Sequence, residues 1–312
     1  MKAYFKFKSE TKLTMNTCTQ PQTAFALGMT PLMKTTRPQT LAARLLLLLF
    51  LLALPAVVQA ADYTYTTSNG QLTITRYTGP GGAVVIPATI NGRPVTRIGD
   101  YAFSQKSAIT SVTIPTSVTR IGGGAFVYCT GLTSIEVDPL NSSYVGLEGV
   151  LFNKSLTSLV QYPGGKAGSY TIPDSVTSIG GFAFAHCTGL TGVYFQGQPP
   201  RLLSGPFEGA NQATVYYLPG STGWGSTFSN RPTALWLPEV RNVAARFGVH
   251  ENQFGFDVSW APGQTVVVEA ATDLAAPVWS PVQTLTLAGD SIHFSDPQGT
   301  LQPVRFYRLR IP

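Results

Sequence analysis

The stretch VTRIGGGAFVYCTGLTSIEV, residues 118–137, decides the fold because the chain repeats it with few changes. It occurs again as VTRIGDYAFSQKSAITSVTIP at residues 95–115 and as VTSIGGFAFAHCTGLTGVYF at residues 176–195. The first two copies are 23 residues apart, whereas the third follows after 58 residues. We interpret the longer gap as one repeat plus a 35-residue insertion that runs from Glu136 to about Tyr170.

The spacing inside each copy predicts short strands that stack. Apolar residues two apart, such as Val112 and Ile114, are typical of a strand with one buried face. A repeat this short cannot bury its apolar face alone, so the copies must share one continuous core. The sequence therefore predicts a mainly β protein with a solenoid of about 23-residue repeats and parallel strands.

Equivalent apolar residues of the three copies define the expected core. We predict that Phe103, Phe126 and Phe184 form an internal aromatic column. Cys129 and Cys187 occupy one position in the repeat and are expected to pack beside this column as small apolar side chains. A disulfide bridge between these two cysteines is the less favoured alternative.

The pattern IGxxAFxxCxxLTxVxIPxSVTxIG resembles the BspA-like leucine-rich repeat of bacterial and protist surface proteins, over about residues 65–236. The insertion, with its VLFNK and LVQYPGGK segments, is similar to a unit that recurs in the same family. We expect residues 149–154 and 158–163 to be the two strands of a hairpin added to the solenoid. The resemblance implies a protein that acts by binding, in adhesion or in recognition at the cell surface.

The formal net charge of +6 lies in the N-terminal segment. Residues 1–60 hold seven of the 21 Lys and Arg residues but one of the 15 Asp and Glu residues, so the rest of the chain is balanced. A nucleic-acid partner would need basic residues on the folded part of the protein. We therefore predict no nucleic-acid partner.

An apolar run of 14 residues, Leu45 to Val58, follows Lys34, Arg37 and Arg44. This order of basic and apolar residues is typical of a signal peptide, here residues 33–60 with cleavage after Ala60. The run is shorter than the roughly 20 residues that a membrane-spanning helix needs. We expect a secreted or cell-surface protein without a transmembrane anchor after cleavage, and we interpret residues 1–32 as an upstream segment that precedes the true start.

The repeat region with its caps extends over residues 61–237. Asn69-Gly70 within residues 63–74 predicts a hairpin that covers the N-terminal end of the core. A different pattern begins at residue 238. Residues 254, 256, 258 and 260 are apolar and alternate with other residues, and turn signals separate further short strands. We predict a small β-sandwich over residues 238–312. The segments VEAATDLAAPVWSPVQT and FSDPQGTLQPVRFYRLRIP resemble a C-terminal module of secreted proteins from Verrucomicrobia-like bacteria, and no activity follows from this resemblance.

Three arginines close to the C-terminus, Arg305, Arg308 and Arg310, permit two interpretations. They are either a basic strip for a glycan or an anionic surface, or the ordinary charges of a solvated strand, and we favour the second.

No set of residues in the sequence indicates catalysis, so we predict no catalytic residue, no cofactor and no metal, and hence no enzyme. The histidines 186, 250 and 293 lack the spacing of metal ligands. Glu136 and Asp138 would share one face of a strand, as in a carbohydrate-active parallel β-helix, but the other copies carry no carboxylate at the equivalent positions. Asp138, Asn141 and Glu148 do not follow a calcium-loop spacing.

The outward positions of the repeat strands are the candidate site. A solenoid presents such positions as a rigid array, and we expect a protein or glycan ligand at the cell surface to contact it. Tyr194 is our first choice because it is the aromatic residue of the set, and its alternative role is to pack on a neighbouring side chain. The candidate residues are Ser111, Thr113, Ser134, Glu136, Gly192 and Tyr194. The alternatives are the carbohydrate-active enzyme and a structural envelope spacer without a specific ligand.

The signal-peptide assignment predicts the N-terminus of the exported protein. N-terminal sequencing of the protein recovered from the cell envelope or the medium should begin at Ala61. An exported chain that still carries residues 45–58 would contradict this assignment.

Overall fold

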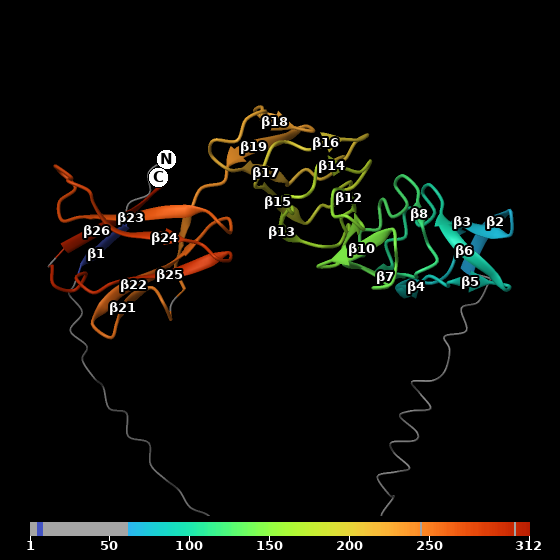
Figure 1. Ribbon diagram of the computed structural model, residues 1–312, viewed down its shortest axis with the longest axis horizontal. Coiled ribbons are helices and arrows are strands. Elements are labelled where there is room, and N and C mark those ends of the chain that lie inside the picture. The colour runs from blue at the N-terminus through green and yellow to red at the C-terminus, as the bar shows by residue number, and fades with distance from the viewer. Residues whose placement is uncertain (1–4, 9–61, 244, 303) are drawn as a thin grey trace, which may run out of the picture.

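The computed structural model describes residues 5–8, 62–243, 245–302 and 304–312, and every helix or strand assigned within them is a β-strand. Figure 1 shows a curved stack of strands from β2 to β19, the repeat region, followed by a separate group of strands from β20 to β26, the C-terminal module. No helix in the described part of the chain is long and apolar enough to cross a membrane. The predicted signal peptide, residues 33–60, lies outside the described residues.

A hairpin closes the N-terminal end of the repeat region. Asn69 and Gly70 have φ angles of 49° and 76°, as a two-residue turn with left-handed central residues requires. The turn joins β2 (Tyr63–Ser68) to β3 (Gln71–Tyr77) in antiparallel register, so the hairpin predicted from Asn-Gly is confirmed. The other strands of this sheet are β5 (Thr89–Ile90), β6 (Arg93–Ile98) and β8 (Arg120–Ile121).

Most of the repeated strands run parallel to their neighbours, as predicted, and the longer ones lie in two sheets. In the first sheet β7 lies between β4 and β9 and is parallel to both. In the second sheet β13, β15, β17 and β19 are parallel in this order, and β18 is antiparallel to β19. The strands are β4 (Gly82–Val85), β7 (Ile109–Ile114), β9 (Ser134–Val137), β13 (Gly168–Thr171), β15 (Leu190–Phe195), β17 (Thr214–Tyr217), β18 (Thr227–Phe228) and β19 (Arg231–Leu235).

The insertion is part of the solenoid. The predicted hairpin strands are β11 (Val150–Asn153) and β12 (Ser158–Gln161), and β10 (Tyr144–Leu147) adds a third antiparallel strand that the sequence analysis missed. The last strand, β12, is parallel to β14 (Ser178–Ile179), which is parallel to β16 (Arg201–Leu202). The insertion therefore supplies a turn of the solenoid as well as a hairpin.

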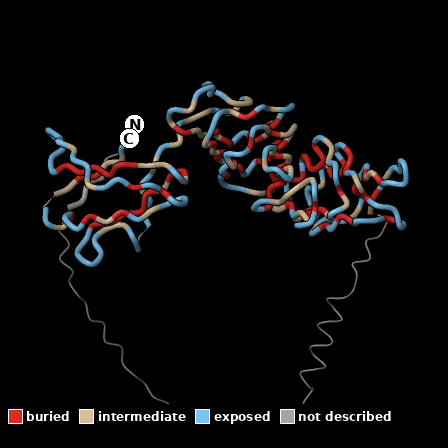
Figure 2. Tube along the Cα trace, viewed as in Figure 1, coloured by how far each residue is buried: buried red, intermediate tan, exposed pale blue. Residues whose placement is uncertain are grey.

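A buried aromatic column runs through the repeat region. The ring centroids of Phe103 and Phe126 are 5.1 Å apart, and those of Phe184 and Phe207 are 4.7 Å apart with an interplanar angle of 8°. Between these pairs the insertion contributes Tyr162, whose centroid lies 5.3 Å from that of Phe184. The predicted rings are thus stacked inside the repeat region, but in two groups that belong to separate buried clusters, with Tyr162 as a member outside the repeat consensus. Figure 2 shows buried residues along the inside of the whole stack.

Both cysteines in the described part of the chain, Cys129 and Cys187, are free and buried. The Sγ atom of Cys129 lies 3.0 Å from the carbonyl oxygen of Phe103. Burial raises the pKa of the Cys129 thiol to about 11 and also raises the pKa of Cys187. Both thiols stay protonated at neutral pH, which agrees with the predicted packing role.

The C-terminal module consists of two antiparallel sheets that share one core, in which Phe256, Phe294 and Tyr307 are in contact. The strands of one sheet are β1 (Phe5–Lys8), β26 (Val304–Arg310), β23 (Thr265–Ala271) and β24 (Ser280–Thr286). Those of the other are β20 (Glu239–Arg241), β22 (Gln253–Ser259), β21 (Gly248–His250) and β25 (Ser291–Asp296). The assignment as a β-sandwich module and the boundary at residue 238 stay predictions.

Two details of the module differ from what the sequence indicated. The alternating pattern of β22 suggested one buried face, but Gly255 and Asp257 are buried as well. Residues 5–8, which the sequence analysis placed upstream of the true start, pair with β26 in the structure. The start at Met33 stays a prediction.

The arginines of β26 are held in ion pairs. Arg308 and Arg310 both contact the buried carboxylate of Glu269 on β23, at N–O distances of 2.6 and 2.7 Å. Arg305 contacts Asp296 at 3.0 Å. Burial alone would raise the pKa of Glu269, but hydrogen bonds from Arg310 and Arg308 lower it below its usual range. These arginines therefore act within the module, but the favoured interpretation as charges of a solvated strand is wrong for Arg305 and Arg308, whose side chains are largely buried in their ion pairs.

The aromatic column predicts a large effect of truncation. Phe184→Ala should lower the free energy of unfolding by about 3–5 kcal/mol, because it leaves a cavity between Tyr162 and Phe207. Leu140→Ala is the control, since Leu140 is 84% exposed and its truncation should cost less than about 0.5 kcal/mol. Urea unfolding followed by tryptophan fluorescence measures both variants, and equal losses would contradict the column as a main source of stability.

The Glu269 ion pairs predict a pH-dependent stability. Since the folded state lowers the pKa of Glu269, the stabilisation is complete above the unfolded-state pKa of about 4.3 and is lost as the pH falls through the folded-state pKa. Glu269→Gln should cost on the order of 3 kcal/mol at pH 7, because it leaves two arginines without their anion. Urea unfolding at pH 7 and pH 3 should show a smaller pH effect in the variant, and an unchanged pH effect would refute this assignment.

Candidate binding cleft between the repeat sheet and the C-terminal module

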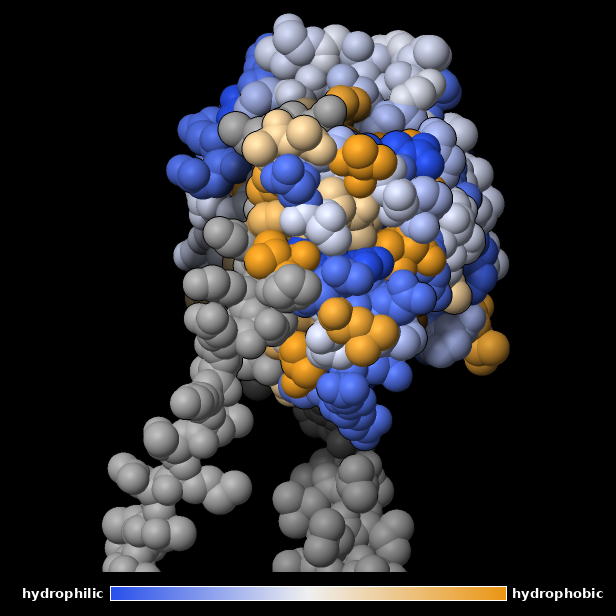
Figure 3. Space-filling view, turned by 90° about the vertical axis from the view of Figure 1, so that its left-hand side faces the viewer, coloured by the Kyte–Doolittle hydropathy of each residue, from blue (hydrophilic) through white to orange (hydrophobic). Residues whose placement is uncertain are grey.

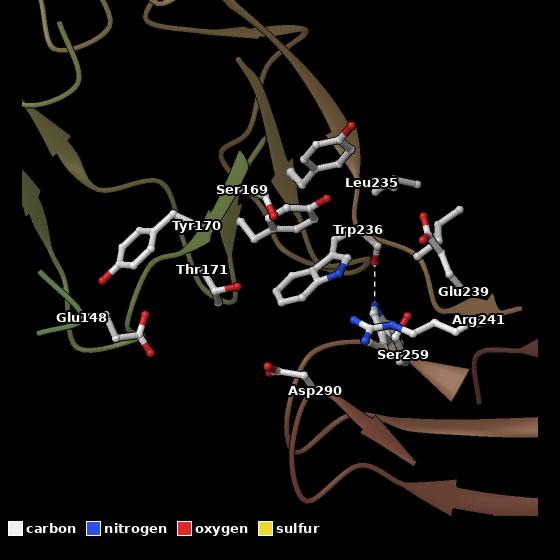
Figure 4. Close-up of a pocket in the computed structure, with 14 residues that line it drawn as sticks. Glu148, Ser169, Tyr170, Thr171, Leu235, Trp236, Glu239, Arg241, Ser259 and Asp290 are labelled. Carbon is white, nitrogen blue, oxygen red and sulfur yellow. Dashed lines mark hydrogen bonds between the residues drawn. The ribbon is translucent and has the colours of Figure 1, made fainter. Parts of the chain in front are cut away.

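A cleft of about 560 Å³ lies where the repeat region meets the C-terminal module. Strands β13, β15 and β17 supply one side of it, including Ser169 and Thr171. The segment that links the two parts of the chain and the module supply the other side. Figure 4 shows the Trp236 side chain between the repeat strands and the module.

Stacked aromatic rings form the wall of the cleft on the repeat side. Tyr194 and Tyr216 are direct partners in the register of β15 and β17, and their rings stack with centroids 4.6 Å apart at an angle of 9°. Trp236 meets Tyr194 edge to face, with centroids 4.8 Å apart. Three rings from three successive turns of the chain thus form one rigid aromatic surface.

Gly192 is what allows the two tyrosine rings to lie over the sheet. It belongs to the same outward row of β15 as Tyr194, yet it is buried. A Cβ atom at this position would lie 2.9 Å from the Tyr194 ring and 3.3 Å from the Tyr216 ring. The predicted role of Gly192 as an outward contact is therefore corrected, because the two rings cover it.

Backbone and side-chain contacts hold Trp236 in place. Its amide donates to the carbonyl oxygen of Tyr217 at 2.7 Å, which continues the ladder from β17 to β19. Its own carbonyl oxygen accepts a hydrogen bond from the indole of Trp260 in the module at 2.8 Å, as drawn in Figure 4. Leu218, at the end of β17, packs into the core of the module. The two sides of the cleft are therefore fixed to each other.

Charged residues surround the aromatic wall. Glu148 lies in the turn between β10 and β11, Glu239 and Arg241 lie on β20, and Asp290 precedes β25. All four are exposed. Burial raises the pKa of Tyr194, and the nearby Tyr216 and Glu239 raise it further. The Tyr194 hydroxyl therefore stays protonated and can both donate and accept a hydrogen bond.

The predicted contact residues lie on two different sheets. Ser111, Thr113, Ser134 and Glu136 belong to the sheet of β4, β7 and β9, in which Ser111 pairs with Ser134 and Thr113 with Glu136. Tyr194 and Gly192 belong to the sheet of β13, β15 and β17.

The insertion separates the two sheets, because the amide of Ile135 in β9 donates to the carbonyl oxygen of Gly149. The single continuous array expected from the repeats is therefore absent from the described residues. The Ser134 hydroxyl donates to the Glu136 carboxylate, so these two predicted contact residues are hydrogen-bonded to each other.

Sequence analysis missed Tyr216 and Trp236 as members of the site. The unit that contains β17 lacks the Ile-Gly and Ala-Phe pairs of the consensus, so its outward positions were not aligned with those of β15. A weaker signal was present, because Val193-Tyr194-Phe195 recurs as Val215-Tyr216-Tyr217. Nothing periodic in the sequence marks Trp236.

The other candidate groups serve the fold. The carboxylate of Asp138 accepts a hydrogen bond from the amide of Leu140 in a turn. The side-chain amide of Asn141 bonds to Pro115, Val118, Ser143 and Tyr144, so it anchors the insertion. No group of three His, Cys, Asp or Glu side chains that could hold a metal ion occurs among the described residues.

The surface of the module seen in Figure 3 shows hydrophobic residues in separate spots among hydrophilic ones. Exposed apolar residues of the module include Val278 and Leu301, which are 80% and 71% exposed. On this face, scattered apolar residues of this kind need no partner to explain them. The cleft is therefore the stronger candidate site.

Comparison with known proteins finds a family model that matches one part of the repeat region. Residues 164–224 match the family model described as BspA type Leucine rich repeat region (6 copies). This segment contains β13 to β17, and with them the repeat side of the cleft. Trp236 and the residues of the module lie outside the match. A search of curated proteins finds no match.

Several solved structures are similar to part of the chain. The leucine-rich repeat protein TpLRR of T. pallidum is 29% identical over 50% of this chain and 79% of that one, with a TM-score of 0.34. A leucine-rich repeat protein from Bacteroides capillosus is also 29% identical, over 45% and 98% of the two chains, with a TM-score of 0.30. A leucine-rich cell surface protein from Faecalibacterium prausnitzii is 18% identical over 52% and 88%, with a TM-score of 0.24.

Proposed function

We propose that this protein is exported through its signal peptide, residues 33–60, and acts at the cell surface by binding, in adhesion or recognition. The observation that supports this function is the cleft of about 560 Å³ with the aromatic wall of Tyr194, Tyr216 and Trp236. Binding sites are typically concave, largely preformed and lined by aromatic side chains with a few polar groups. The cleft is concave and has an aromatic wall, and half of its lining residues are polar or charged.

Rigid walls favour binding because little conformational entropy is lost when a ligand enters. The tyrosines stand on adjacent parallel strands, and the backbone of Trp236 is hydrogen-bonded on both sides of the cleft. Preorganised side chains of this kind lower the cost of association. The geometry therefore supports a recognition surface in the cleft, with Tyr194 at its centre.

The proposed function predicts that Tyr194 contributes to affinity and Glu136 does not. Purified protein is tested for saturable binding on a glycan array and on immobilised extracellular-matrix proteins. Tyr194→Ala should weaken binding about tenfold or more, since a buried aromatic contact is a typical hot spot. Glu136 lies on the other sheet, so the Glu136→Ala variant should bind with the same affinity as the unchanged protein.

Tyr128→Ala is the matched aromatic control, because Tyr128 is 38% exposed and lies in the repeat region outside the cleft. Equal losses in Tyr194→Ala and Tyr128→Ala would contradict a specific site in the cleft. An absence of saturable binding would favour a structural spacer. Release of a shortened glycan during the assay would favour the carbohydrate-active enzyme.

A further inference from the structure

We infer that the ligand of the cleft is a saccharide that is uncharged or carries an amino group, with a sugar ring held against the aromatic wall. This inference rests on the proposed binding function and specifies its ligand. Three observations carry it: the geometry of the rings, the balance of charges and the size of the cleft.

The rings present their edges, and the faces that their mutual stacking leaves uncovered, next to hydrogen-bonding groups. Tyr194 and Tyr216 stack in parallel, and Trp236 stands at 61° to the Tyr194 ring. Aromatic side chains with a polar tip suit ligands that have both an apolar face and hydroxyl groups. A pyranose ring is such a ligand, since its C–H groups can lie on a ring while its hydroxyls reach polar neighbours.

Polar groups are present where those hydroxyls would lie. The outward residues of β13, Ser169 and Thr171, are exposed beside the tyrosines. The hydroxyl of Tyr194 stays protonated because burial raises its pKa. Hydroxyl side chains can donate hydrogen bonds to the hydroxyls of a sugar and accept them, and carboxylates can accept them.

The charges of the cleft select against anionic sugars. Glu148, Glu239 and Asp290 line it, and among the described lining residues Arg241 is the one cation. A surplus of carboxylates gives the site a negative potential, which attracts cations and repels anions. Uronic acids and sulfated sugars are thus disfavoured, whereas an amino sugar gains from the carboxylates.

The size of the cleft favours a saccharide over a folded protein. Its volume of about 560 Å³ is within the range of small-molecule sites, about 300–1,000 Å³. A stable protein interface buries more than about 1,000 Å² and needs a broad surface. In the repeat region the parallel strands on either side of the insertion belong to separate sheets and do not provide one continuous face.

Calorimetric titration of the purified protein with three probes tests the inference. The probes are a neutral β-glucan trisaccharide, a glucosamine trisaccharide and a galacturonic acid trisaccharide. The first or second should bind at least about tenfold more tightly than the third, because the carboxylates oppose the anionic probe.

Cleft variants locate the bound sugar. Tyr216→Ala should weaken binding about tenfold or more, whereas Tyr128→Ala should leave it unchanged. Trp236 also packs against the module core, so Trp236→Phe, which keeps a ring, accompanies Trp236→Ala and should retain most of the affinity. Thermal unfolding of each variant separates a loss of contact from a loss of folding.

A charge-neutral variant tests the selectivity on its own. Glu148→Gln combined with Asp290→Asn should narrow the preference for the neutral over the anionic probe about tenfold. Both residues are exposed, so the double variant should fold normally. An unchanged preference would remove the carboxylates from the explanation and overturn the charge assignment.

The results of these titrations distinguish a failure of the inference alone from a failure of the proposed function as well. Tighter binding of the anionic probe, or saccharide binding that survives both Tyr216→Ala and Trp236→Ala, would overturn the inference. If no saccharide binds but a protein ligand does, and Tyr194→Ala abolishes that binding, the inference fails while the proposed function stands. If nothing binds on the arrays or in the calorimeter, both fail.

Discussion

A turn of the repeat region buries its aromatic ring only when the next turn lies against it. Phe103 packs on Phe126, and Phe184 packs between Tyr162 and Phe207. Hydrogen bonds join the same turns, such as the one from the Phe103 amide to the Ala125 carbonyl oxygen. Each turn is thus stabilised mainly by its neighbours, as in other repeat proteins. This constraint sets the parallel register that later places Tyr194 beside Tyr216.

The insertion modifies this stacking without interrupting it. Tyr162 continues the column, but two separate buried clusters meet here, with Leu151 in one and Phe152 in the other. In the insertion turn Gly164 carries no side chain, and a Cβ atom there would lie 2.7 Å from the carbonyl oxygen of Cys129. Tyr128 and His186, from the turns on either side, therefore reach each other and stack with centroids 3.9 Å apart.

The sequence predicted the repeats, the buried column and the hairpin at Asn69 because each follows from local spacing. It did not predict that the insertion would divide the outward strand positions between two sheets, since β10 has no counterpart in the consensus. Of the six residues predicted for the candidate site, Tyr194 is the one that lines the cleft. Tyr216 stands in a degenerate repeat, and Trp236 joins the site through the docking of a different module, which no periodic pattern encodes.

The packing of Leu218 into the module core has a thermodynamic consequence for the cleft. Because Leu218 directly follows β17 and packs into the module core, and Trp260 donates a hydrogen bond to Trp236, unfolding of the module would remove one wall of the cleft and uncover the end of the solenoid. A ligand that needs both walls binds the docked state only, and its binding energy adds to the stability of that state by mass action. A bound ligand therefore couples the unfolding of the last turn of the solenoid to the unfolding of the module, so that the two parts unfold together.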